Sequence, residues 1–207
     1  MMTATLIQTV PSDVTDKSFY SPEEYLEIEE KSDLKHEYRD GEIIEMAGGT
    51  TNHNEIAGNF YTFLKLALKG KKYRIYFGDV RLWIPQYRQF TYPDVMVIQG
   101  EPIYEGKGTT TITNPMLIVE VLSPSTQDYD RGTKFTRYRS IPELRDYILI
   151  DQDQFAIEQF TKNPEGQWIL TDIHGEDSSL VFASLDLQIR LKDIYEGVKF
   201  AIASEQE

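Results

Sequence analysis

Two short apolar segments that each carry one acidic residue limit what this chain can fold into. The first is Tyr92–Ile98, with Asp94 directly after Pro93, and the second is Leu117–Leu122, with Glu120 inside it. Both are rich in β-branched residues, which favour strands, and an unpaired charge buried in a strand costs more free energy than packing returns. The acids therefore need partners. Two interpretations are open. Either Asp94 ends a loop and Glu120 pairs with an arginine, or the two acids share a divalent metal ion on neighbouring strands.

A possible cationic partner follows the second apolar segment. Residues 123–126, Ser-Pro-Ser-Thr, break the strand, and a helix is predicted near residues 131–140. Lys134 follows Asp130 by four residues and precedes Tyr138 by four, so the three side chains share a helix face. We therefore expect Lys134 to be directed back at the carboxylates, the alternative being an ordinary solvated lysine.

Local signals near the start of the chain predict a helix followed by a hairpin. Ser21 is an N-cap residue with proline next to it and Glu24 three positions later, so a helix should run from about Pro22 to Lys31. Asp40-Gly41 predicts the turn of a β-hairpin within residues 35–46.

The remainder of the chain predicts a mixed α/β fold. Thr51 should cap a long helix that ends at Gly70. Strands are expected at 73–84, 92–99, 115–122, 145–151, 154–161, 167–173 and 188–191. Strands interspersed with helices favour an α/β domain over a sandwich. Without an internal repeat, 1–207 is expected to form a single domain with its core at about 20–195 and loose ends at 1–17 and 202–207.

Composition narrows the class of protein. A chain of 207 residues with 40% hydrophobic and 12% aromatic residues can bury a real core. It contains no apolar run near the ~18 residues of a membrane span, so no membrane partner is expected. The start of the chain lacks the basic flank of a signal peptide. Absence of cysteine excludes disulfides and thiolate metal sites, and a cytoplasmic location is the plain expectation.

The net charge of −13 argues against a simple nucleic-acid binder, but the charge is unevenly distributed. Residues 61–90 contain seven basic residues and one acidic residue, a local net charge of +6. These basic residues are either a solvated surface or a track for nucleic-acid phosphates with strongly salt-dependent affinity. The candidate nucleic-acid-binding residues are Lys65, Lys69, Lys71, Lys72 and Arg74, with Arg81 and Arg88 further along.

Taken together, these motifs resemble the Uma-two family of endonucleases, which belongs to the PD-(D/E)XK nuclease superfamily. The motifs that carry the resemblance are Pro93-Asp94, Glu120–Leu122, Ser123–Thr126, Asp130 to Lys134, Glu37–Glu42, Ala47–Gly49 followed by His53, and Tyr147–Asp151. Each motif is weak alone, but their order and spacing together are fairly specific, over roughly residues 20 to 195.

The resemblance implies a restriction-endonuclease-like fold, a mixed central sheet flanked by helices, and a metal-dependent site. Asp94 and Glu120 would be metal ligands for magnesium or manganese, joined by the main-chain carbonyl of Val121. Glu37 would be the upstream acid of the site, and His53 would face the metal pocket. Alternatively, Glu37 is an exposed hairpin acid and His53 a capping or surface residue.

One position departs from the superfamily pattern. The usual lysine lies two residues after the second acid, where this chain has Leu122. By resemblance, the following helix supplies the cation, which corresponds to Lys134.

The function expected from these residues is magnesium-dependent hydrolysis of DNA phosphodiester bonds. A second interpretation is a nuclease-like scaffold that has lost cleavage and serves as a binding or assembly module, which Leu122 and the acidity favour. A third, a ligand-binding protein, requires a closed apolar pocket without the acid pair. His36 and His174 have no convincing partners in the sequence, and a homodimer is compatible with it. The distinguishing observation is whether Asp94, Glu120 and Lys134 converge.

Overall fold

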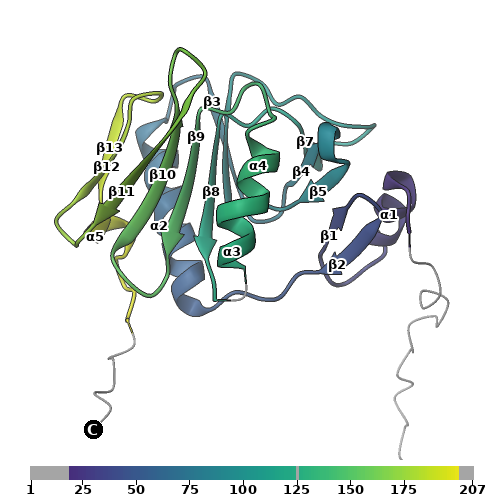
Figure 1. The fold of residues 1–207 in the computed structure, drawn as a ribbon, viewed down its shortest axis with the longest axis horizontal. Helices are drawn as coiled ribbons and strands as arrows, with labels where there is room; N and C mark the ends of the chain where they lie inside the picture. The colour runs from purple at the N-terminus through teal and green to yellow at the C-terminus, as the bar shows by residue number, and fades with distance from the viewer. Residues whose placement is uncertain (1–18, 125, 201–207) are drawn as a thin grey trace, which may run out of the picture.

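A six-stranded mixed sheet forms the centre of the computed structural model, which describes residues 19–124 and 126–200 (Figure 1). The strand order is β11-β10-β9-β8-β6-β3, and neighbours are antiparallel except for the parallel pair β8 and β9. The strands are β3 (Tyr73–Phe77), β6 (Val95–Gln99), β8 (Leu117–Leu122), β9 (Asp146–Asp151), β10 (Ala156–Lys162) and β11 (Trp168–His174). This mixed sheet with its flanking helices confirms the predicted α/β class.

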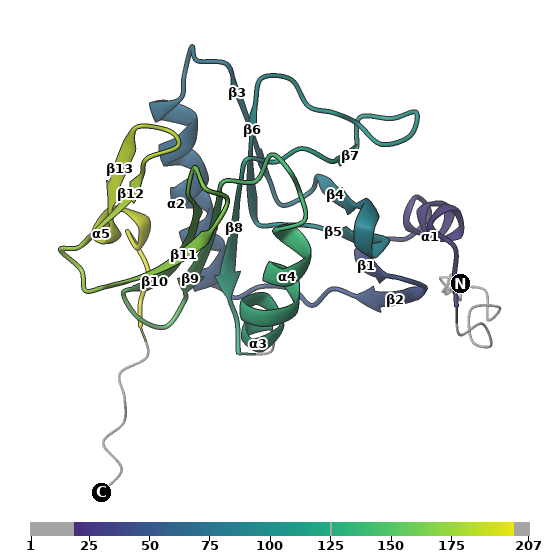
Figure 2. The ribbon, with the colours of Figure 1, turned by 45° about the horizontal axis from the view of Figure 1, so that its top comes forward.

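Helices cover both faces of the sheet, as Figures 1 and 2 show for α2 on one side and α4 on the other. Alternate residues of a strand point to opposite faces. The odd-numbered residues of β8 accordingly pack in the core cluster of α2 (Thr51–Ala67), whereas Ile118 and Leu122 pack in the cluster of α4 (Phe135–Tyr138). Glu120 shares the α4 face because it lies two residues from each of these side chains.

A second sheet continues the fold at one end of the molecule (Figure 2). Its strand order is β2-β1-β5-β4-β7. The strands are β1 (His36–Arg39), β2 (Glu42–Glu45), β4 (Arg81–Ile84), β5 (Gln89–Thr91) and β7 (Thr111–Ile112), with a short 3-10 helix, η2 (Pro85–Tyr87), between β4 and β5. The single strand expected at 73–84 is therefore wrong. Gly78, with φ of +68°, lies in the break after β3, and β4 joins the other sheet.

The N-terminal helix and hairpin occur as predicted. Helix α1 (Pro22–Glu29) begins with a capping box, in which Ser21 Oγ accepts from the Glu24 amide and the Glu24 carboxylate accepts from the Ser21 amide. The fully buried Tyr25 of α1 stacks on Tyr38 of β1, with ring centroids 5.4 Å apart. This packing joins α1 to the hairpin that carries Glu37.

The starts of two helices differ from expectation. Thr50 caps α2 instead of Thr51, because its Oγ accepts from the His53 amide at 3.1 Å. The helix expected near 131–140 starts earlier and is not a regular α-helix. It comprises α3 (Gln127–Tyr129), the π-helical turn η3 (Asp130–Lys134) and α4. Single π-turns inside helices occur frequently at functional sites.

The C-terminal part covers the outer side of α2. The hairpin of β12 (Ser179–Phe182) and β13 (Leu187–Arg190) and the short helix α5 (Leu191–Ile194) belong to the same core cluster as α2. Phe182 meets Phe60 of α2 edge to face at 5.9 Å. Strand β12 and helix α5 were not expected from the sequence. Among the helices of residues 19–124 and 126–200, none has the length and apolar character needed to cross a membrane.

Candidate active site

The predicted acids lie where β6 and β8 part. Pairing between these strands ends at Val95 and Val119. Val121 is the next residue of β8 whose amide points toward β6, and this amide has no partner on that strand. This amide donates to Asp94 Oδ2 at 2.7 Å. The N–H and C=O groups of one strand residue point to the same edge, so the Val121 carbonyl is expected on the Asp94 side as well. Strand separation thus creates room for one carboxylate beside Glu120.

Glu120 is held from the helix opposite its strand. The residue is 4% exposed, and its Oε1 accepts from Lys134 Nζ at 2.9 Å and from the Tyr138 hydroxyl at 2.6 Å. Burial raises the pKa of Glu120 to about 8, with Lys134 opposing and the charges of Asp94 and Asp130 adding to the shift. Both hydrogen bonds from described residues end on Oε1, which leaves Oε2 as a possible metal donor.

Lys134 lies among three carboxylates. Its Nζ is 2.9 Å from Glu120, 3.0 Å from Asp130 and 3.9 Å from Glu37. Burial alone would lower the pKa of Lys134, but these carboxylates raise it well above the ordinary value, so the ammonium stays charged. The structure therefore brings the predicted lysine into contact with the predicted acid.

Leu122, at the usual lysine position, is a buried apolar residue beside Glu120. It faces the same side of β8 but is only 5% exposed and packs in the apolar cluster that contains Tyr138. Because Leu122 places an apolar side chain at this position, the ammonium group that contacts Glu120 comes from the helical segment instead.

Glu37 and His53 complete the set of predicted catalytic residues. Glu37 is buried rather than an exposed hairpin acid, and it accepts from the Thr91 hydroxyl and from Arg39 Nε, the latter at 2.9 Å. Burial opposes ionisation, but Lys134, Thr91 and Arg39 together lower the pKa of Glu37. His53 Nε2 lies 3.2 Å from Asp94 Oδ2. Burial lowers the pKa of His53, but the hydrogen bond and charge of Asp94, together with the charges of Glu120 and Asp130, outweigh burial and raise it.

Asp130 and Tyr138 belong to the same cluster, although the sequence did not assign them to the site. Their four-residue spacing from Lys134 was the available signal. Asp130 is 2% exposed, and its Oδ1 lies 3.0 Å from Lys134 Nζ without forming a hydrogen bond to any described residue. His36, in contrast, does have a partner, because its Nδ1 lies 3.0 Å from Glu29 Oε2.

The predicted basic track lies away from these acids. Lys65 is twelve residues beyond His53 on α2, which corresponds to ~18 Å along the helix. Lys69, Lys71 and Lys72 follow it, and Arg74 pairs with Ile98, four residues beyond Asp94 and ~13 Å along β6. The structure therefore does not bring these side chains to the acid cluster. Arg81 is buried against Thr111, and Arg88 pairs with Asp40, so neither extends the track.

The donor set suits a hard cation. Magnesium commonly uses one or two carboxylates and keeps several waters, and it prefers oxygen ligands. Asp94, Glu120 and the Val121 carbonyl provide such oxygens, and Asp130 Oδ1 is a further buried oxygen that accepts no hydrogen bond from any residue that the structure describes. Within residues 19–124 and 126–200, however, three or more His, Asp or Glu side chains are nowhere grouped as a metal cage. Binding of a metal ion here would therefore depend on the carboxylates of Asp94 and Glu120 and on the main-chain carbonyl of Val121.

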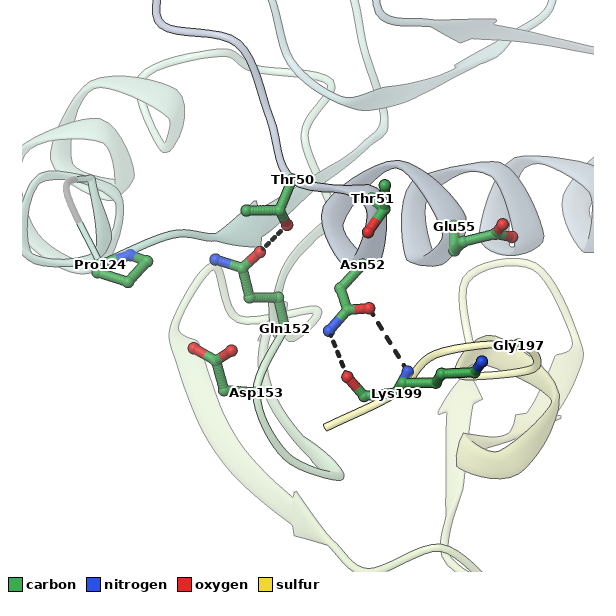
Figure 3. A pocket seen from close by; sticks show the side chains of 9 residues that line it. All are labelled: Thr50, Thr51, Asn52, Glu55, Pro124, Gln152, Asp153, Gly197 and Lys199. Carbon is green, nitrogen blue, oxygen red and sulfur yellow. Dashed lines mark hydrogen bonds between the residues drawn. The ribbon is translucent and has the colours of Figure 1, made fainter. Parts of the chain in front are cut away.

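A polar pocket of about 440 Å³ opens beside the start of α2 (Figure 3). Its lining residues are Thr50, Thr51, Asn52, Glu55, Pro124, Gln152, Asp153, Gly197 and Lys199. Figure 3 shows Thr50 turned toward Gln152, with their oxygens 2.5 Å apart, and Asn52 bonded to the main chain of Lys199. Such a lining is unlike the closed apolar pocket that a ligand-binding protein would need.

Comparison with a solved structure identifies the fold. The fold matches the crystal structure of a putative nuclease belonging to DUF820 from Anabaena variabilis with a TM-score of 0.70 and 18% identity. The match covers 85% of this chain and 97% of that one, so the two proteins share the same α/β fold.

Sequence comparison then gives the family. The Uma2 family, described as "Putative restriction endonuclease", matches residues 22–192. Two uncharacterized proteins of Synechocystis are similar along most of their length. The protein sll1609 is 41% identical over 79% of this chain and 93% of its own, and slr1290 is 39% identical over 87% and 93%. The chain belongs to the Uma2 family, as its motifs predicted.

Proposed function

We propose that this protein hydrolyses phosphodiester bonds of DNA in a magnesium-dependent reaction. The observation that carries the proposal is the meeting of three side chains at the ends of β6 and β8. Asp94 is bonded to the main chain directly after Glu120, and Glu120 is bonded to Lys134. Membership of a family described as "Putative restriction endonuclease" supports the same chemistry.

Asp94, Glu120 and the Val121 carbonyl would hold the ion, magnesium or manganese, and Glu37 would bind a second ion or a metal-bound water. When bound, such an ion neutralises phosphate charge and lowers the pKa of water so that a nucleophile forms near neutral pH.

The protein's own side chains prepare this site. The Val121 amide and His53 both contact Asp94 Oδ2, while Lys134 and Tyr138 both contact Glu120 Oε1, so each carboxylate has one anchored oxygen. Lys134 would stabilise negative charge that develops on the phosphate or orient the attacking water.

Asp94→Asn and Glu120→Gln test this proposal directly. Each replaces a charged hard ligand with a weak neutral one, so each should abolish magnesium-stimulated cleavage and leave the fold intact. Cleavage of plasmid and oligonucleotide DNA would be measured with magnesium, with manganese and with EDTA, alongside circular dichroism. Glu101→Gln is the matched control, because the Glu101 side chain is 78% exposed. Full activity in either of the first two variants removes the metal-site proposal.

The second candidate function is a non-catalytic binding or assembly module. Leu122 at the usual lysine position and a net charge of −13 favour it. Purified wild-type protein that binds a partner but cleaves no nucleic acid with any divalent metal would make this the better assignment.

A further inference from the structure

Tyr129, the residue before Asp130, lies outside the acid cluster and contacts several polar side chains. The centroid of its ring is 3.8 Å from the guanidinium carbon of Arg39 and 5.9 Å from Lys134 Nζ. Its hydroxyl accepts from Gln89 Nε2 at 3.1 Å and lies 3.5 Å from Arg137 Nη1. One tyrosine thus connects the lysine of the proposed site with two arginines.

The two arginines are fixed by the second sheet. Arg39 on β1 stands opposite Gln89 on β5, and the Gln89 side chain, which is fully buried, accepts from Arg137 Nη1 at 2.6 Å. Arg39 donates from Nε and Nη2 to a single oxygen of Glu37. The two guanidinium groups are therefore held in place from one strand pair.

Each arginine keeps unused donors. A guanidinium group has five N–H donors in a planar fork. The bonds of Arg39 to described residues use only its Nε and Nη2, and those of Arg137 use only Nη1. Both side chains are half-buried, whereas Lys134 is enclosed, so the arginines lie at the rim of the site and the lysine lies inside it.

We infer that Arg39 and Arg137 bind a phosphate group next to the scissile one, so that the site takes a polynucleotide strand in preference to a small phosphodiester. This inference rests on the proposed function. Planar guanidinium forks match phosphate oxygens and give stronger hydrogen bonds than neutral donors. Contacts of this kind set the register of the strand without reading its sequence.

The test compares two substrates of the full-length protein. Oligonucleotide DNA has neighbouring phosphates, whereas bis(4-nitrophenyl) phosphate has only one. Arg137→Ala should lower kcat/KM on DNA by about 10- to 100-fold, the effect of one charge-assisted contact, and this loss should exceed the loss on the small diester at least tenfold. Arg39→Lys, which keeps the charge but removes the fork, should show the same preference. An equal loss on both substrates would mean a structural role and overturn the inference.

Arg139→Ala is the matched control, because Arg139 is exposed on the same helical segment two residues away. It should resemble wild type on both substrates. Fluorescence anisotropy with a labelled DNA duplex in EDTA measures the same contact without catalysis. There, Arg137→Ala should bind about 10-fold more weakly than Arg139→Ala, and equal affinities would refute the inference. If wild type cleaves neither substrate with magnesium, the proposed function fails, while the anisotropy comparison still decides whether the arginines bind phosphate.

Discussion

Replacing Lys134 should affect both the stability and the activity of this protein, because its single ammonium group lies within 4.0 Å of three buried acidic side chains. Its Nζ is 2.9 Å from Glu120, 3.0 Å from Asp130 and 3.9 Å from Glu37, and none of these acids is more than 4% exposed. Removing one partner of a buried ion pair typically costs ~3–5 kcal/mol. Lys134→Ala should therefore lower the free energy of unfolding by about this amount without metal. Added magnesium should restore part of the loss, since a bound cation stabilises the folded state.

The effect on turnover is a separate quantity. Loss of one preorganised group that stabilises charge in the transition state lowers the rate by on the order of 10²-fold or more. Urea denaturation with and without magnesium would measure stability, and single-turnover cleavage of labelled DNA would measure the chemical step. Lys134→Met, which keeps the aliphatic stem, separates loss of charge from loss of packing. Lys107→Ala is the control, because Lys107 is exposed and lies outside both the cluster and the basic segment.

A rescue variant tests the displaced lysine itself. Leu122 faces the same side of β8 as Glu120, so Leu122→Lys in the Lys134→Ala background should restore part of the rate. The rescue should be incomplete because a buried lysine brings a desolvation cost. If wild type cleaves DNA with magnesium and Lys134→Ala cleaves equally well, the role given to Lys134 is wrong and the nuclease proposal survives.

Two further predictions concern DNA binding by the basic segment and the stability of the protein at acidic pH. If the basic segment binds DNA phosphates outside the acid cluster, combined Lys71→Glu and Lys72→Glu substitutions should weaken binding to unrelated DNA sequences alike and flatten its salt dependence. Unchanged binding across a salt titration would show that this segment is only a solvated surface. The pKa of Glu37 is lowered, so its carboxylate contributes stability above its unfolded-state pKa and loses that contribution as the pH falls below about 4. Glu37→Gln should therefore reduce the drop in unfolding free energy between neutral and acidic pH, measured by urea denaturation, and an identical drop in both proteins would contradict this.

Much of the local structure was predictable because its causes lie within a few residues. The capping box at Ser21 and Glu24 and the hairpin turn at Asp40-Gly41 both satisfy backbone groups of their own neighbours. The two apolar runs also became the strands that carry the proposed site. The family, too, followed from the order and spacing of motifs along the chain.

The second sheet was less predictable, because it depends on pairing between distant segments. Residues 73–84 look like one strand, but β3 pairs with β6 and β4 pairs with β5. Nothing within the segment itself specifies that its halves belong to different sheets.

By itself, the sequence determined the fold class, the family and the candidate residues Asp94, Glu120 and Lys134, since hydrophobic pattern and motif spacing are properties of the chain alone. Only the tertiary structure decided which charges meet. It enclosed Lys134 among three carboxylates, placed Lys65 at the far end of α2, and joined Gln89 to Arg137 across 48 positions of sequence. Such contacts are set by strand register and by the face on which each helix packs, and both arise only when the layers of the fold come together.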